Sequence, residues 1–234
     1  MLERDFQRSI RKAGEFLNEL GFLRSLRNPS SLSISKEFNS VALSTLVKHD
    51  SVYFRALELN YYNILLSDYS LFQFSLISEG ARPELRLCFI PNPSTVIDYE
   101  PTESINDIRL FESMFRSGEI DFEEFSQALS ELDYYFSIPI VRVDASYTQF
   151  VKIHHPAVHM HVGLNNPSRI ALDRVWSPFM FTLFVVKNFY CDLWHAKTGE
   201  SFRLEKLAKE EKDQLALLED KYFCPVQKGL INLL

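Results

Sequence analysis

The chain has 234 residues, 46% of them hydrophobic and 24% charged, which are the proportions of an ordinary soluble globular protein. A net charge of −6 excludes a strongly basic nucleic-acid-binding surface but leaves room for a local basic pocket. The three cysteines form no CxxC pair, so neither a disulfide framework nor a thiolate zinc site is indicated. The charged, amphipathic start is unlike a signal peptide and no apolar run is long enough to span a membrane, so we expect a cytoplasmic protein with no membrane segment.

Helical patterns dominate the first part of the chain. Residues 3–20 place apolar side chains at helical spacing, and Gly21 follows where a C-cap glycine would stand. Residues 36–48 predict a second helix, whereas residues 51–62 fit either a helix or a strand. We therefore expect a helical N-terminal segment over residues 1–60.

Alternating apolar and polar residues predict the strands of the central part. Residues 70–77 and 84–90 alternate in this way and are separated by a turn. Residues 138–145 and 148–155 predict a hairpin, and residues 157–164 predict a further strand. These segments favour a mainly antiparallel sheet.

Further helices are expected between and after these strands. Residues 105–116 and 121–132 predict two short helices. Ser177 and Pro178 predict the start of a buried helix, with serine as its N-cap and proline at its first position. Residues 203–220 predict a highly charged helix. Its apolar stripe consists of Leu204, Leu207, Leu215 and Leu218.

Together these patterns predict an α+β fold. We expect a sheet of about five or six strands with flanking helices and helical N- and C-terminal segments. The α+β core domain is placed at residues 61–200, and a C-terminal helix and tail at residues 201–234.

A histidine-rich segment is the strongest indication of a functional site. Val158, Met160 and Val162 point one way on an extended chain, whereas His159 and His161 point the other way. A strand with an aliphatic face and an imidazole face is typical of the wall of a binding site.

The preceding strand follows the same rule. Arg142 and Asp144 share one of its faces, and Arg169 follows the histidine strand. If the two strands pair, Arg142, Asp144, His159 and His161 lie on one polar surface, although the sequence does not fix their register.

One chemistry that fits these residues is phosphodiester cleavage without a metal. His159 and His161 would act as general base and acid, because the pKa of imidazole lies near neutrality. Arg142 or Arg169 would bind the phosphate.

A second chemistry is binding of a divalent metal. His159 and His161, at i and i+2 on a strand, can bind one ion, and His155 or Asp144 would add a third ligand. In both chemistries the catalytic candidates are His155, His159, His161 and Asp144.

A third chemistry is nucleotide handling. The segment Val158–Val162 resembles part of the strand of histidine-triad proteins, but Gly163 stands where a third histidine would be needed. The non-functional alternatives are a structural polar network and a solvated sheet face.

A more remote pattern involves acidic residues earlier in the chain. Asp68, with Glu84 and Arg86 on the next strand, loosely resembles the acidic hairpin of restriction-type nucleases, which holds magnesium near a lysine. The alternative is that these are outward polar residues of two ordinary strands.

A wider resemblance extends over roughly residues 60–195. The motif residues are Arg142-x-Asp144, His155-Pro-x-x-His159-x-His161-x-Gly163, Arg169, Pro178-x-x-Phe181 and Asn188-Phe-Tyr190. This series resembles a family of bacterial proteins of unknown function. The resemblance implies a setting in prokaryotic toxin or phage-defence operons, where nuclease-like effectors are common.

Two functions are therefore expected as alternatives. The first is a bacterial effector that acts on a phosphodiester or nucleotide, with nucleic acid or a nucleotide as its partner. The second is a non-enzymatic subunit of a multiprotein complex, which binds a protein from the same operon through aromatic side chains and the leucine-striped helix.

Overall fold

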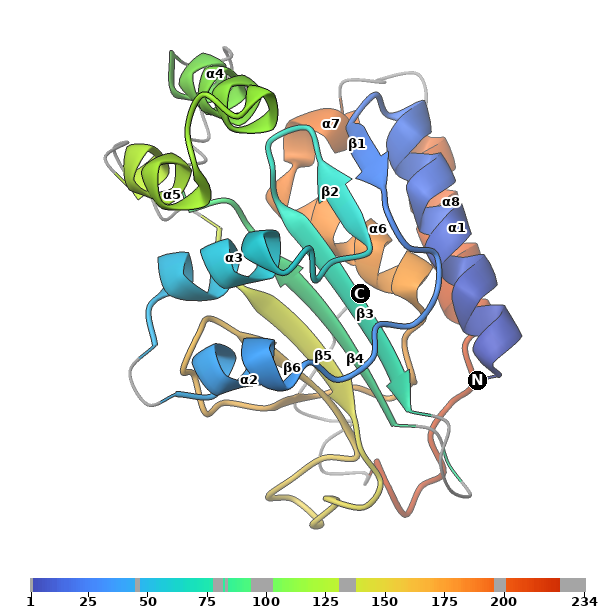
Figure 1. Cartoon of the computed structure of the whole chain (residues 1–234). Coiled ribbons are helices and arrows are strands. Elements are labelled where there is room, and N and C mark those ends of the chain that lie inside the picture. The colour runs from blue at the N-terminus through green and yellow to red at the C-terminus, as the bar shows by residue number, and fades with distance from the viewer. Residues whose placement is uncertain are drawn as a thin grey trace.

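The fold is α+β, as the sequence predicts. The computed structural model describes residues 2–44, 47–77, 82, 84–93, 103–130, 138–195 and 201–223. Within these residues, eight helices surround one seven-stranded antiparallel sheet (Figure 1).

The sheet is a meander in which each strand pairs with the next along the chain. The strands are β1 (Leu23–Leu26), β2 (Ile64–Leu66), β3 (Leu71–Ile77), β4 (Glu84–Ile90), β5 (Val141–Ala145), β6 (Val158–Val162) and β7 (Ile170–Ala171). The strand number exceeds the expected five or six because β1, β2 and β7 are too short to show alternation in the sequence.

The helices are α1 (Glu3–Glu19), α2 (Lys36–Ala42), α3 (His49–Glu58), α4 (Glu103–Ser117), α5 (Phe122–Ser130), α6 (Pro178–Phe189), α7 (Cys191–His195) and α8 (Ser201–Gln214). The ambiguous segment 51–62 is thus largely helical. The charged helix ends at Gln214 instead of residue 220, because Leu217 and Leu218 leave it to pair with the backbone at residues 173 and 174. Within the described ranges, no helix has the length and apolar composition needed to cross a bilayer.

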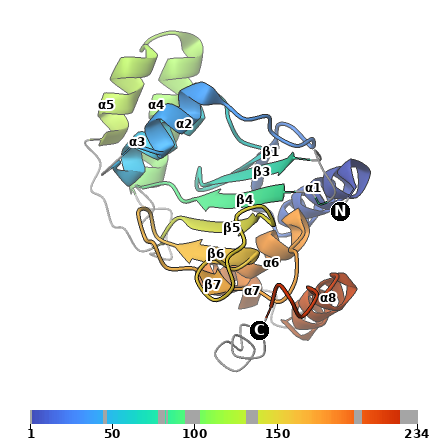
Figure 2. The same ribbon diagram turned by 90° about the horizontal axis from the view of Figure 1, so that it is seen from below.

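Helices cover both faces of the sheet (Figure 2). On one face α1 and α6 pack against a large apolar core, in which Phe72, Phe74, Met160 and Phe181 are almost completely buried. On the other face α2 and α3 pack over a smaller core. The polar residues of β4, β5 and β6 share that second face and lie beside the smaller core.

The predicted hairpin between residues 138–145 and 148–155 is wrong. The antiparallel partner of β5 is β6, with Ala145 opposite Val158, and the intervening residues form a loop. The backbone at Ile153 prevents residues 148–155 from joining the sheet. Ile153 has a φ of 73°, outside the extended region, and its side chain is 62% exposed.

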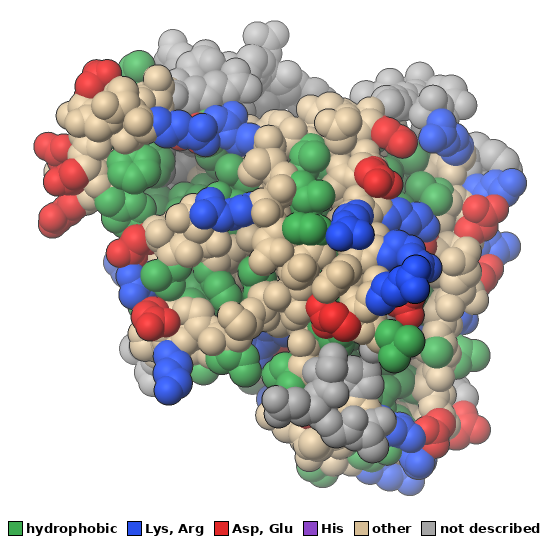
Figure 3. Space-filling model, turned by 45° about the vertical axis from the view of Figure 1, so that its right-hand side comes forward, with side chains coloured by type: hydrophobic (Ala, Val, Ile, Leu, Met, Phe, Trp, Pro, Cys, Tyr) green, Lys and Arg blue, Asp and Glu red, His purple; other side chains and the backbone are tan. Residues whose placement is uncertain are grey.

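The outer surface carries charges of both signs. In the view of Figure 3, basic and acidic side chains are interspersed over the described residues, with no broad region of a single sign. This face of the molecule therefore shows no basic stripe.

Candidate functional site

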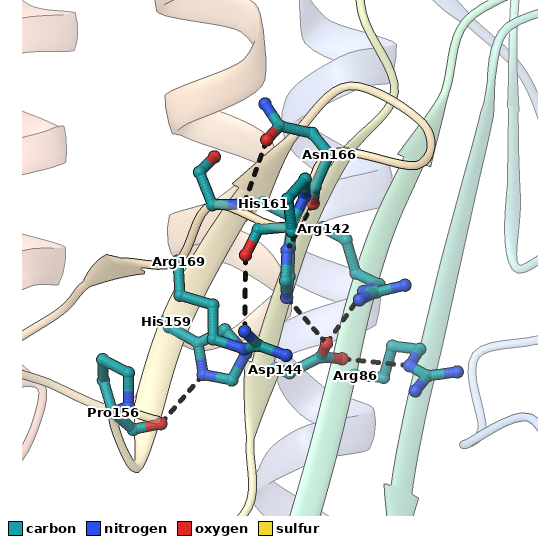
Figure 4. A network of polar contacts seen from close by, with 10 residues as sticks. Arg86, Arg142, Asp144, Pro156, His159, His161, Asn166 and Arg169 are labelled. Carbon is teal, nitrogen blue, oxygen red and sulfur yellow. Dashed lines mark hydrogen bonds and ion pairs between the residues drawn. The ribbon is translucent and has the colours of Figure 1, made fainter. Parts of the chain in front are cut away.

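The register of three neighbouring strands brings the predicted polar residues together. Asp144 of β5 lies opposite His159 of β6 on one side and opposite Arg86 of β4 on the other. Arg142 lies opposite His161 in the same way. The site is therefore one continuous polar patch on the face of the sheet opposite α1 and α6 (Figure 4).

Asp144 is the centre of this patch. The Nε of Arg86 donates a hydrogen bond of 3.0 Å to Asp144 Oδ1, and the Nε of Arg142 lies 2.8 Å from Oδ2. The second contact is an ion pair without hydrogen-bond geometry. Burial alone would raise the pKa of the Asp144 carboxyl, but the Arg142 and Arg86 guanidinium groups outweigh it and lower that pKa.

Backbone carbonyl groups orient both strand histidines. His159 Nδ1 lies 2.9 Å from the Pro156 carbonyl oxygen, and His161 Nδ1 lies 3.3 Å from that of Asn166. A carbonyl oxygen can only accept a hydrogen bond, so each Nδ1 carries the proton. In the neutral ring, Nε2 then keeps its lone pair and can bind a metal or accept a proton.

The two imidazoles are buried, with 2% exposure for His159 and 8% for His161. Burial lowers the pKa of His159 to about 4. Burial, and then the Arg142 guanidinium, lower the pKa of His161 below its usual value. Both rings are therefore neutral near pH 7, which suits metal ligation and makes His159 a poor general acid at that pH.

Asp144, His159 and His161 form a candidate metal centre. One carboxylate oxygen and one nitrogen from each imidazole lie within 4.8 Å of one another. Two ligands of one ion, each at about 2.1 Å from it, lie at most about 4.2 Å apart. An ion would therefore draw these three side chains slightly closer together.

His155 and Arg169 lie at the margin of this centre. The His155 ring meets that of His159 edge-on, with 4.8 Å between centroids, but His155 does not belong to the three-ligand cluster. Its buried Nδ1 has no hydrogen-bond partner in the described part of the chain. Arg169 is exposed, and its positive charge contributes to lowering the pKa of His161.

On the sequence alone, Arg86 is expected in a nuclease-like hairpin and not in this patch. Asp68 and Glu84, its supposed partners in a nuclease-like hairpin, are held elsewhere: Tyr190 donates to Asp68, and Ser146 donates to Glu84. Only the pairing of β4 with β5 places Arg86 against Asp144, and no local pattern in the sequence specifies that pairing.

The patch borders a groove between α2 and the sheet. It consists of two adjoining cavities of about 260 and 280 Å³. The first is lined in part by Arg86 and Asp144, and the second by Arg86, Arg142 and His161. The charged groups of the site are thus accessible to a small ligand.

Comparison with known proteins agrees with the family resemblance. No curated protein and no solved structure matches the chain significantly. The family described as Uncharacterized conserved protein (DUF2290) matches residues 19–224, which include all of β1 to β7 and the whole polar patch. The chain therefore belongs to the DUF2290 family.

Proposed function

We propose that the protein is a metal-dependent hydrolase of phosphate esters, with the metal held by Asp144, His159 and His161. The observation that carries the proposal is the convergence of three ligand atoms within 4.8 Å, beside a groove whose cavities are lined by Asp144 and by His161. A mixed set of two imidazoles and one carboxylate suits zinc, manganese and related divalent ions.

The surroundings of the ligands support this proposal. Hydrogen bonds from metal-binding histidines to backbone carbonyl groups fix the ring orientation and the tautomer, as the bonds of His159 and His161 do here. Arg86 and Arg142 each approach a different oxygen of Asp144. A carboxylate has about four acceptor positions, so both arginines and an ion can share it.

The phosphate ester is proposed because of the arginines. Arg86 and Arg142 line the groove beside the ligands, and Arg169 adds a third positive charge near His161. Guanidinium groups bind phosphate oxygens with two parallel hydrogen bonds and stabilise the charge of the transition state.

Each group would have a defined task in hydrolysis. An ion held by Asp144, His159 and His161 would lower the pKa of bound water and polarise a phosphoryl oxygen. Water adds to phosphorus, the bond from phosphorus to the leaving oxygen breaks, and the proton of the water passes to that oxygen. His155, whose ring lies edge-on against that of His159, would carry this proton.

An assay of bis(p-nitrophenyl) phosphate and of short DNA and RNA oligonucleotides tests the proposal. We expect turnover with added Mn²⁺ or Zn²⁺ and none after chelation. Loss of a residue that only supports a metal ligand typically reduces activity by roughly 10- to 100-fold. Asp144→Asn alters a ligand itself, so it should reduce the rate by more than that. Asp213→Asn, on the exposed side of α8, is the matched control and should leave the rate unchanged.

Three results would overturn the proposal. They are turnover that survives chelation, an unchanged rate in Asp144→Asn, and the absence of metal-dependent turnover on all of these substrates.

A further inference from the structure

The groove beside the metal centre has a charged part, near the arginines, and an apolar part. Both of its cavities are lined by Phe38 and Asn39 of α2 and by Leu43, which follows that helix. The sheet contributes Gln73 and Arg86 to both. The guanidinium of Arg86 therefore stands where the two cavities meet, next to Asp144.

The walls away from the arginines are mainly apolar. Val52, Ile90 and Ile140 line the second cavity together with Phe38 from α2. Cys88 also lines this cavity, and burial raises the pKa of its thiol to about 12, so it adds no negative charge. A flat ring could be buried against these walls.

Two side-chain amides supply polar groups within this apolar region. Gln73 donates from Nε2 to the carbonyl oxygen of Tyr61 at 2.6 Å, which fixes the amide and leaves its oxygen as an acceptor. Asn39 makes no side-chain hydrogen bond to any residue that the structure describes, so its amide offers both donors and an acceptor.

We propose that this groove binds the base of a nucleotide whose phosphate lies at Arg86 and Arg142. A base has apolar faces and an edge of hydrogen-bond donors and acceptors, so it requires apolar walls with a few amide groups, as Phe38, Asn39 and Gln73 provide. This inference rests on the proposed function, because it takes the phosphate to be the group that is hydrolysed.

The size of the groove limits the ligand to about one nucleotide unit. Each cavity is close to the lower end of the range for small-molecule sites, about 300 Å³. A duplex would also need a broad basic surface, which a chain of net charge −6 does not indicate. The unit is therefore a mononucleotide or the end of a single strand.

Calorimetric titration of the full chain tests the inference. The probes are AMP, GMP, CMP, UMP, a dinucleotide and ribose 5-phosphate, which carries the sugar and phosphate without a base. We expect at least one nucleotide to bind about ten-fold more tightly than ribose 5-phosphate, in line with the contribution of one buried base. Tighter binding of the dinucleotide than of any mononucleotide identifies a strand end as the ligand, and the reverse identifies a free mononucleotide.

Three variants of α2 locate the base. Asn39→Leu removes the amide at similar size, and Ala42→Phe fills the second cavity. Both should abolish the preference for nucleotides and leave the affinity for ribose 5-phosphate unchanged. Ser40→Leu, at an exposed position of the same helix, is the control and should retain the preference.

The inference fails if ribose 5-phosphate binds as tightly as every nucleotide, or if both groove variants keep the preference. These outcomes are separable from failure of the proposed function. Metal-dependent hydrolysis without a preference for a base would refute only the base-binding groove. A preference for a base without metal-dependent hydrolysis would refute only the proposed reaction.

Discussion

Asp144 of β5 lies directly opposite His159 of β6, and this pair joins the carboxylate to the imidazoles of the candidate metal centre. Side chains directly opposite one another in an antiparallel pair have Cβ atoms about 4.5 to 5.5 Å apart. The close approach of these groups therefore follows from the register of two strands.

Replacing Arg86 with alanine should weaken substrate binding and raise the pKa of Asp144. Arg86 donates to the Asp144 carboxylate and lines both cavities of the groove. Loss of one hydrogen bond to a charged group should raise KM by about ten-fold or more. Steady-state kinetics and an NMR titration of the Asp144 carboxyl group check the two effects. An unchanged KM would show that Arg86 does not contact the substrate.

The metal-free protein should lose stability as the pH falls from about 6.5 to about 4. The pKa of His159 is about 4 in the folded protein and near its ordinary value of 6.5 in the unfolded chain. The unfolded chain therefore binds the proton first, so this contribution to stability is complete above pH 6.5 and is lost on acidification. Urea unfolding at several pH values measures the effect.

A variant isolates the contribution of this histidine from that of the carboxylates. His159→Phe has a ring of similar size that takes up no proton, so its stability should change less over the same pH range. An identical pH dependence in the two proteins would show that His159 is not buried as a neutral ring.

Replacing Phe72 with alanine should reduce the free energy of unfolding by about 3 to 5 kcal/mol. Phe72 is fully buried and contacts the rings of Phe89 and Phe181, so its loss leaves a cavity between the sheet and α6. Leu110→Ala is the control, because Leu110 is 56% exposed and its truncation should cost little. Equal costs for the two variants in urea unfolding would contradict this packing.

Replacing Ile153 with glycine should increase stability. Its φ of 73° is unfavourable for a β-branched residue and readily adopted by glycine. Relief of this strain stabilises the folded protein, whereas the added freedom of glycine stabilises the unfolded chain. The net effect should raise the free energy of unfolding by about 0.5 to 1 kcal/mol. Val151→Gly, at an exposed position of the same loop without positive φ, should lower it instead. Destabilisation by both variants would contradict the strain argument.

Local signals in the sequence predicted much of the fold. Ser177 is the N-cap of α6 as expected, since its hydroxyl accepts a hydrogen bond from the backbone N–H of Met180. The strict alternation around Met160 also predicted which face of β6 is apolar and which carries the histidines.

Relationships between distant segments could not be predicted in the same way. Alternation specifies which side chains share a face of a strand, but not which strands pair. Residues 151–154 alternate too, and they lie outside the sheet because the backbone at Ile153 is not extended. The position of Arg86 beside Asp144 depends on the pairing of β4 with a strand that follows two intervening helices. The expectations of a partner protein and of a defence-operon setting stay predictions.

Elemental analysis of the purified protein, after incubation with Zn²⁺ or Mn²⁺ and dialysis, tests whether Asp144, His159 and His161 hold a metal ion. His159→Ala removes one ligand of the candidate centre, and His154→Ala is the matched control at an exposed neighbouring position. We expect the unmodified protein and His154→Ala to retain one metal ion per chain, and His159→Ala to retain little or none. A metal-free unmodified protein, or equal metal content in His159→Ala, would show that these residues do not form a metal centre.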